Sequence, residues 1–161
     1  MKKAAAFLIA LTLLFSLCAC VAPTEYTEME LGGTGTFYDV EYKIPSYYIF
    51  DSTESKENFV VYESGWYSKI LLMSRGGVTK DPARLHLESY AEGVKEFGAH
   101  YCEFIEFNGV EAVLAKYNVE DKPCTEVYFV YGNSTYAIAL RGETEENVDI
   151  FMSAVKLLPL S

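Results

Sequence analysis

Alternating apolar and polar positions predict that the body of this chain begins with a β-strand. In TFYDVEYKI, at residues 36–44, every second residue from Tyr38 to Ile44 falls on one side of an extended backbone. Pro45 ends the strand, because proline cannot donate a backbone hydrogen bond to a neighbouring strand. The pattern therefore predicts one half-buried strand at the start of the folded domain.

Turn residues divide the later apolar stretches into hairpins. The segment at residues 58–74 predicts two strands joined at Ser64-Gly65, and Gly76-Gly77 ends the second strand. Asn108-Gly109 is the strongest turn signal in the chain. The last two strands, within residues 125–142, carry apolar residues on both faces, and such strands need cover on both sides.

Two segments change to the spacing of an amphipathic helix. At residues 81–98, Asp81 is a natural N-cap, Pro82 suits the first helical position and Gly98 fits the C-terminal stop. The apolar stripe of this helix consists of Leu87, Tyr90, Ala91, Val94 and Phe97. A second helix is expected over about residues 145–157, capped by Thr144, with its stripe at Val148, Phe151, Met152 and Val155.

These elements predict an α+β fold in which helices sandwich a mainly antiparallel sheet. The order of elements resembles the PsbP-like fold: two early strand pairs, a helix, a meander with Asn-Gly at its first turn, then YAIAL and a final helix ending in SAVKLL. The resemblance covers residues 36–158, within a single expected domain at residues 36–161. The family has no shared catalytic residues and its described members act mainly by binding protein partners, so the resemblance implies a binding role.

The N-terminus has the layout of a secretory signal. Lys2 and Lys3 precede an uncharged apolar stretch at residues 4–17, which is too short for a typical membrane-spanning helix. The following LCAC resembles the bacterial lipobox. This resemblance implies that residues 1–19 are a signal peptide and that Cys20 is acylated. The alternative is an ordinary signal peptide in which Cys20 has no special role.

A lipid on Cys20 would place the protein on the outer face of the bacterial cytoplasmic membrane. Residues 20–35 are polar and glycine-containing, and we interpret them as a flexible tether between the lipidated N-terminus and the domain. The GGTGT within them, at residues 32–36, lacks the lysine and the following helix of a phosphate-binding loop. It is therefore interpreted as part of the spacer.

Charge excludes one class of partner. Loss of Lys2 and Lys3 with the signal peptide leaves 11 basic residues against 23 acidic ones, a net charge of about −12. Such a surface repels the phosphates of nucleic acids, so DNA or RNA binding is not expected. The two cysteines of the body, Cys102 and Cys124, fall on separated strands of the expected meander, and we expect two free, mostly buried thiols.

No constellation typical of an enzyme, a metal site or a cofactor site is present. His86 and His100 lie in no triad motif. His100 and Cys102 share a strand face, but the sequence offers no third residue that would complete a catalytic triad with them. There is no CxxC, HxxxH or Asp-rich calcium loop. In the Asn-Gly hairpin Glu106 faces Glu111, a repulsion that a bound cation or, more simply, solvent could relieve.

Aromatic residues beside turns are the remaining candidates for function. Tyr47, Tyr48, Trp66 and Tyr67 flank turns and form a possible partner patch, unless they only plug the ends of the sandwich. We therefore expect a non-enzymatic, extracytoplasmic lipoprotein that binds a protein partner. The alternatives are a glycan or cell-wall binding module that uses the same aromatics, and a hydrolase with carboxylate chemistry that the sequence does not locate.

Overall fold

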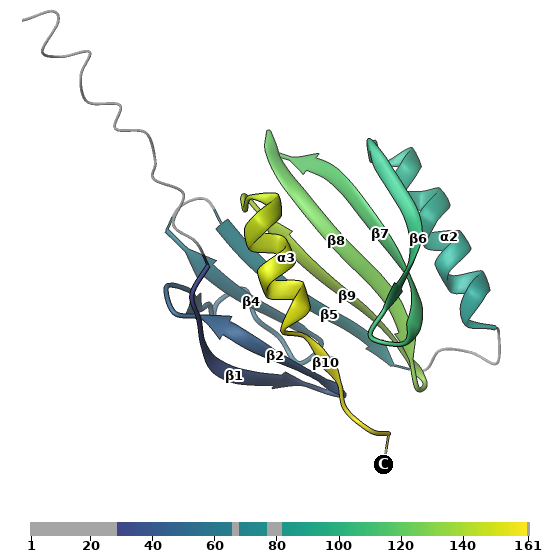
Figure 1. The fold of residues 1–161 in the computed structure, drawn as a ribbon. Coiled ribbons are helices and arrows are strands. Elements are labelled where there is room, and N and C mark those ends of the chain that lie inside the picture. The colour runs from purple at the N-terminus through teal and green to yellow at the C-terminus, as the bar shows by residue number, and fades with distance from the viewer. Residues whose placement is uncertain (1–28, 66–67, 77–81, 161) are drawn as a thin grey trace, which may run out of the picture.

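The computed structural model describes residues 29–65, 68–76 and 82–160, which form two antiparallel sheets and two helices (Figure 1). The large sheet has seven strands in the order β3-β4-β5-β9-β8-β7-β6. The small sheet has three strands in the order β1-β2-β10. The prediction of an α+β fold built on a mainly antiparallel sheet is confirmed.

The bounds of the elements follow the chain. The large sheet contains β3 Ile49–Phe50, β4 Phe59–Ser64, β5 Ser68–Gly76, β6 Tyr101–Phe107, β7 Val110–Val119, β8 Lys122–Tyr131 and β9 Ser134–Arg141. The small sheet contains β1 Leu31–Phe37, β2 Val40–Pro45 and β10 Lys156–Leu157. The helices are α2 Ala83–Glu96 and α3 Glu145–Ser153. Neither helix is long and apolar enough to cross a membrane.

The large sheet is apolar on both faces, as the sequence predicts. On one face Phe129 of β8 packs in the main core with Phe151 of α3 and Tyr42 of β2. On the other face Tyr128 packs against a smaller cluster that includes Leu87 of α2. The layers therefore differ from the expected helical sandwich, because α2 covers one face and α3 together with the small sheet covers the other (Figure 1).

The expected flexible tether is shorter than residues 20–35, because Leu31–Gly35 belong to strand β1. Gly35 explains why a glycine-rich segment forms a strand here. A Cβ at Gly35 would lie 2.5 Å from the ring of Tyr42, so only glycine lets that ring pack against the backbone of β1. The folded domain accordingly begins before residue 36, and Met29 is already buried.

The segment at residues 36–44, expected to be a single strand, instead contains the end of β1, a turn and most of β2. Phe37 pairs with Val40 across a turn at Tyr38-Asp39, and Tyr38 has a φ of 51°. Tyrosine is an unusual residue in the left-handed region, so the sequence carries no ordinary turn signal at this point. The Tyr136 hydroxyl donates to Asp39 at 3.0 Å and holds the turn against β9.

The helix ends differ in detail from the expected ones. Asp81 lies outside the described residues and Pro82 occupies the N-cap position of α2, while Phe97 is 69% exposed rather than part of the apolar stripe. The predicted Thr144 cap is confirmed, since its side chain accepts from the Asn147 N–H. However, α3 ends at Ser153, because the residues that follow pair with β2 as β10.

Several local predictions are confirmed by the register of the strands. Asn108 and Gly109 both have positive φ and join β6 to β7, with Glu106 opposite Glu111. Gly98 has a φ of 105° directly after α2. Cys102 and Cys124 are free thiols, as expected from their separation in the meander, although β8 begins at Lys122 and not near Thr125.

The two phenylalanines at the helix ends give a matched test of the core. Phe151→Ala removes a fully buried ring from the main core, so we expect the free energy of unfolding to fall by about 3–5 kcal/mol. Phe97→Ala removes an exposed ring and should cost less than about 1 kcal/mol. Urea unfolding followed by circular dichroism measures both. Equal losses in the two variants would contradict the assignment of the core.

Candidate functional site

The structure buries part of the predicted aromatic patch. Tyr48 is only 6% exposed, and its hydroxyl donates to Oε1 of Glu143 at 2.5 Å. Burial and this hydrogen bond hold the pKa of Tyr48 well above its usual range. Tyr48 is therefore a core residue, and its assignment to a contact patch is wrong.

The other members of the patch have different positions. Tyr47 is half-buried, with its ring centroid 5.1 Å from that of Tyr48, and burial is the main factor that raises the pKa of Tyr47 to about 12. Trp66 and Tyr67 lie outside the described residues, as does Cys20. The described part of the chain therefore leaves only Tyr47, partly exposed, from the aromatic set.

The residues directly after Tyr48 form an exposed apolar pair that the sequence did not single out. Ile49 is 75% exposed and Phe50 is 51% exposed, and together they make the whole of β3. Their backbone pairs with Glu63 and Tyr62 of β4, so β3 is the edge strand of the large sheet. Two large apolar side chains on an open sheet edge are costly in water unless another surface covers them.

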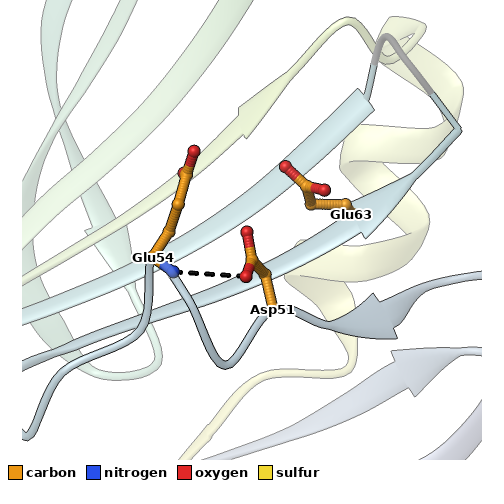
Figure 2. A group of neighbouring side chains, drawn as sticks. All are labelled: Asp51, Glu54 and Glu63. Carbon is orange, nitrogen blue, oxygen red and sulfur yellow. Dashed lines mark hydrogen bonds between the residues drawn. The ribbon is translucent and has the colours of Figure 1, made fainter.

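Three carboxylates gather beside this pair (Figure 2). The side-chain oxygens of Asp51, Glu54 and Glu63 lie within 4.8 Å of one another. Asp51 accepts hydrogen bonds from the backbone N–H groups of Thr53 at 2.7 Å and Glu54 at 3.2 Å. These bonds favour the ionised form and lower the pKa of Asp51.

A lysine on the neighbouring strand already partly neutralises this acidic group. The Lys69 ammonium of β5 lies 2.7 Å from Glu63 Oε1 and 2.9 Å from Glu54 Oε2. These contacts raise the pKa of Lys69. Three carboxylates could offer oxygen ligands to a hard cation such as Ca²⁺, but Lys69 supplies positive charge at the same place. Three carboxylates and one lysine leave this cluster with a net charge of −2, which a basic group of a partner could neutralise.

We call Ile49, Phe50, Asp51, Glu54 and Glu63 the β3 surface. Five neighbouring positions from residue 49 to residue 53, together with Glu63 and Gly65, line an open hollow of about 470 Å³. Gly65, which lines the hollow, directly precedes Trp66 and Tyr67 in the sequence. The structure therefore concentrates exposed apolar and acidic groups around β3 and the end of β4.

The remaining sequence candidates do not combine into a reactive site. The Cys102 thiol donates to the Ala91 carbonyl of α2 at 3.9 Å, whereas His100 lies in the exposed connection after that helix. The repulsion between Glu106 and Glu111 is relieved from within the protein, because Arg84 of α2 forms an ion pair with Glu111. The positive charge that offsets the repulsion between these two glutamates is therefore supplied by the Arg84 side chain.

Comparison with known proteins gives the fold but no close relative. No family model and no curated protein matches the chain. The solution structure of the PsbP protein from the cyanobacterium Synechocystis sp. PCC 6803 matches with a TM-score of 0.53 and 12% identity, covering 86% of this chain and 98% of that one. The chain has a PsbP-like fold. The Ran-binding protein Mog1p of Saccharomyces cerevisiae shares it, with a TM-score of 0.53 and 11% identity over 81% of this chain and 96% of Mog1p.

A third solved structure extends the range of the PsbP-like fold. A protein from Bacteroides thetaiotaomicron matches with a TM-score of 0.52 and 11% identity, covering 81% of this chain and 49% of the other. At such identities the likeness concerns the fold alone. The PsbP-like part of the sequence-based prediction is confirmed, and the function has to be argued from the residues of this chain.

Substitution of the neutralising lysine tests whether the acidic group accepts a metal. With Lys69 in place, we expect calcium at millimolar concentration to leave the melting temperature unchanged. In Lys69→Met the three carboxylates repel one another, so calcium should raise the melting temperature by about 2–4 °C, the shift that roughly 1 kcal/mol gives in a domain of this size. Lys43→Met, in the small sheet, is the control. A calcium shift of equal size in the unsubstituted protein would contradict this account.

Proposed function

We propose that this protein is a membrane-anchored, extracytoplasmic binding protein without enzymatic activity, and that it recognises a protein partner through the β3 surface. The observation that carries the proposal is the exposure of Ile49 and Phe50 beside the carboxylates of Asp51, Glu54 and Glu63. Apolar anchors with a charged rim are the usual anatomy of a protein interface. A partner of matching chemistry has apolar side chains flanked by lysine or arginine.

The position of β3 adds a second element to this surface. Within the described residues β3 pairs only with β4, so no strand pairs with the backbone along its other edge. Addition of a partner strand to a sheet edge combines backbone hydrogen bonds with contacts from alternate side chains. Ile49 and Phe50 point to opposite faces of the sheet, so a partner that wraps the edge can contact both.

The comparison with Mog1p supports protein binding as one use of this fold, since that protein is described as Ran-binding. A fold alone does not specify function, so the support from this likeness is secondary to the β3 surface. The alternative of a glycan or cell-wall binding module depends on stacked, exposed aromatics. Burial of Tyr48 removes one of the residues on which that alternative rests.

Site-specific cross-linking tests the partner and its place of contact. A photoreactive phenylalanine analogue at Phe50 should capture one recurring membrane or cell-wall protein in the native host. The same analogue at Phe97, which is exposed on the α2 side, is the matched control and should not capture that protein. Ile49→Glu should reduce capture at Phe50 at least about tenfold, because the charge occupies an apolar contact. Equal capture at both positions, or capture of peptidoglycan fragments alone, would contradict a protein contact at the β3 surface.

Membrane anchoring rests on the N-terminal sequence and has its own test. The uncharged stretch at residues 4–17 followed by LCAC supports acylation of Cys20. Cys20→Ser should abolish labelling by an alkynyl fatty acid and move the protein from the membrane fraction to the soluble fraction. Cys18→Ser is the matched control, since Cys18 would leave with the signal peptide, and it should keep the label. Persistent labelling of the Cys20 variant would rule out this anchor.

A further inference from the structure

The face of the large sheet that carries α2 is only partly covered by this helix. α2 packs on β6, β7 and β8, and a cleft of about 400 Å³ opens between the helix and the strands β5, β8 and β9. This cleft lies away from the β3 surface and shares none of its residues. Its apolar wall is formed by Met73, Tyr128 and Ala137, and its polar groups include His86, Tyr90 and Glu126.

Glu126 is the feature of the cleft that a purely structural role leaves unexplained. Its side chain is 94% buried, and no other acidic residue in the described part of the chain is buried. Ala115 and Ala139 flank it in the neighbouring strands, so small side chains leave space around the carboxyl group. Burial raises the pKa of Glu126, although the hydroxyls of Tyr117 and Tyr90 act in the opposite direction.

Glu126 has no basic counterion within the described residues. The ion pairs of this part of the protein involve other acids, and the hydroxyls of Tyr117 and Tyr90 offer Glu126 neutral donors. A buried carboxylate is normally paired with a cation, because burial removes the water that would stabilise its charge. A positively charged group of a ligand in the cleft could therefore form an ion pair with the Glu126 carboxylate.

Two further polar atoms in the cleft lack partners. The hydroxyl of Tyr90 and Nε2 of His86 are both buried and without a hydrogen bond. Burial, then the charge of Glu126 and a side-chain interaction with it, raise the pKa of Tyr90, so the Tyr90 hydroxyl lies beside the Glu126 carboxyl group and both can meet one ligand group. The hydroxyl and a neutral imidazole nitrogen can both accept a hydrogen bond from one N–H group. Unsatisfied buried groups of this kind are uncommon in folded proteins.

We infer that this cleft binds a small monoamine with an apolar or aromatic body, whose ammonium group pairs with Glu126 and donates to Tyr90 and His86. The body of such a ligand has a complementary wall, since the ring of Tyr90 stacks on that of Tyr128 with centroids 4.1 Å apart. Arg75 also lines the cleft and carries no ion pair among the described residues, so a second positive charge on the ligand is disfavoured there.

Three indole probes of similar shape test the charge that the cleft selects. Tryptamine carries an ammonium group, tryptophol a neutral hydroxyl and indole-3-propionate a carboxylate. Titration calorimetry on the full chain in detergent should give a Kd for tryptamine at least about tenfold lower than that for either other probe, because only tryptamine forms the charged pair. Equal binding of tryptamine and tryptophol, preference for indole-3-propionate, or no binding of tryptamine at millimolar concentration would overturn the inference.

Two variants place the binding at Glu126. Glu126→Gln keeps the size of the side chain and removes its charge, so the Kd for tryptamine should rise at least about tenfold while that for tryptophol stays within about twofold. Glu106→Gln, on the exposed hairpin, is the matched control and should change neither value. Unchanged tryptamine binding in Glu126→Gln would refute the proposed ion pair.

A third variant keeps the proposal testable if Glu126→Gln does not fold. Ser89 is exposed on α2 and lines the cleft, so Ser89→Phe fills this space without changing the buried carboxyl. It should reduce tryptamine binding at least about tenfold with an unchanged circular dichroism spectrum. Full tryptamine binding in this variant would show that the amine binds elsewhere.

Discussion

The need to cover two apolar faces of one sheet governs this structure. β8 and β9 are buried on both sides, so the chain has to place other elements above and below them. The main core forms where α3 and the small sheet meet one face around Phe129 and Phe151. On the opposite face the described residues supply one helix of 14 residues, which spans about 21 Å and packs mainly on β6, β7 and β8.

Unequal cover explains why the candidate sites lie where they do. On the side of α2 the strands beyond the helix leave a cleft whose floor holds Glu126, a buried carboxyl group without a basic partner among the described residues. At the far edge of the same sheet β3 is only two residues long, and Ile49 and Phe50 remain exposed. Both features arise at the limits of the covering layers, and neither requires a departure from the PsbP-like fold.

The sequence predicts those parts of the fold that depend on local signals. Asn108-Gly109 sets a hairpin through backbone conformation, and Thr144 caps α3 through a bond to a residue three positions on. Features set by distant contacts were mispredicted or missed. Burial of Tyr48 depends on Glu143, 95 residues away, and the glycine-rich β1 is a strand because the ring of Tyr42 packs on Gly35. No local pattern distinguishes such a tyrosine from an exposed one, or such a glycine from a spacer.

The early start of the folded domain has a geometric consequence for a lipid-anchored protein. Met29 is fixed by a hydrogen bond of 2.9 Å from its N–H to Asn147, so eight residues separate the domain from Cys20. Nine extended steps span at most about 32 Å. An anchored domain would therefore stay within a distance of the membrane surface that is roughly its own diameter. A partner fixed in the same membrane would meet it at a high effective concentration, so even weak binding would be sufficient.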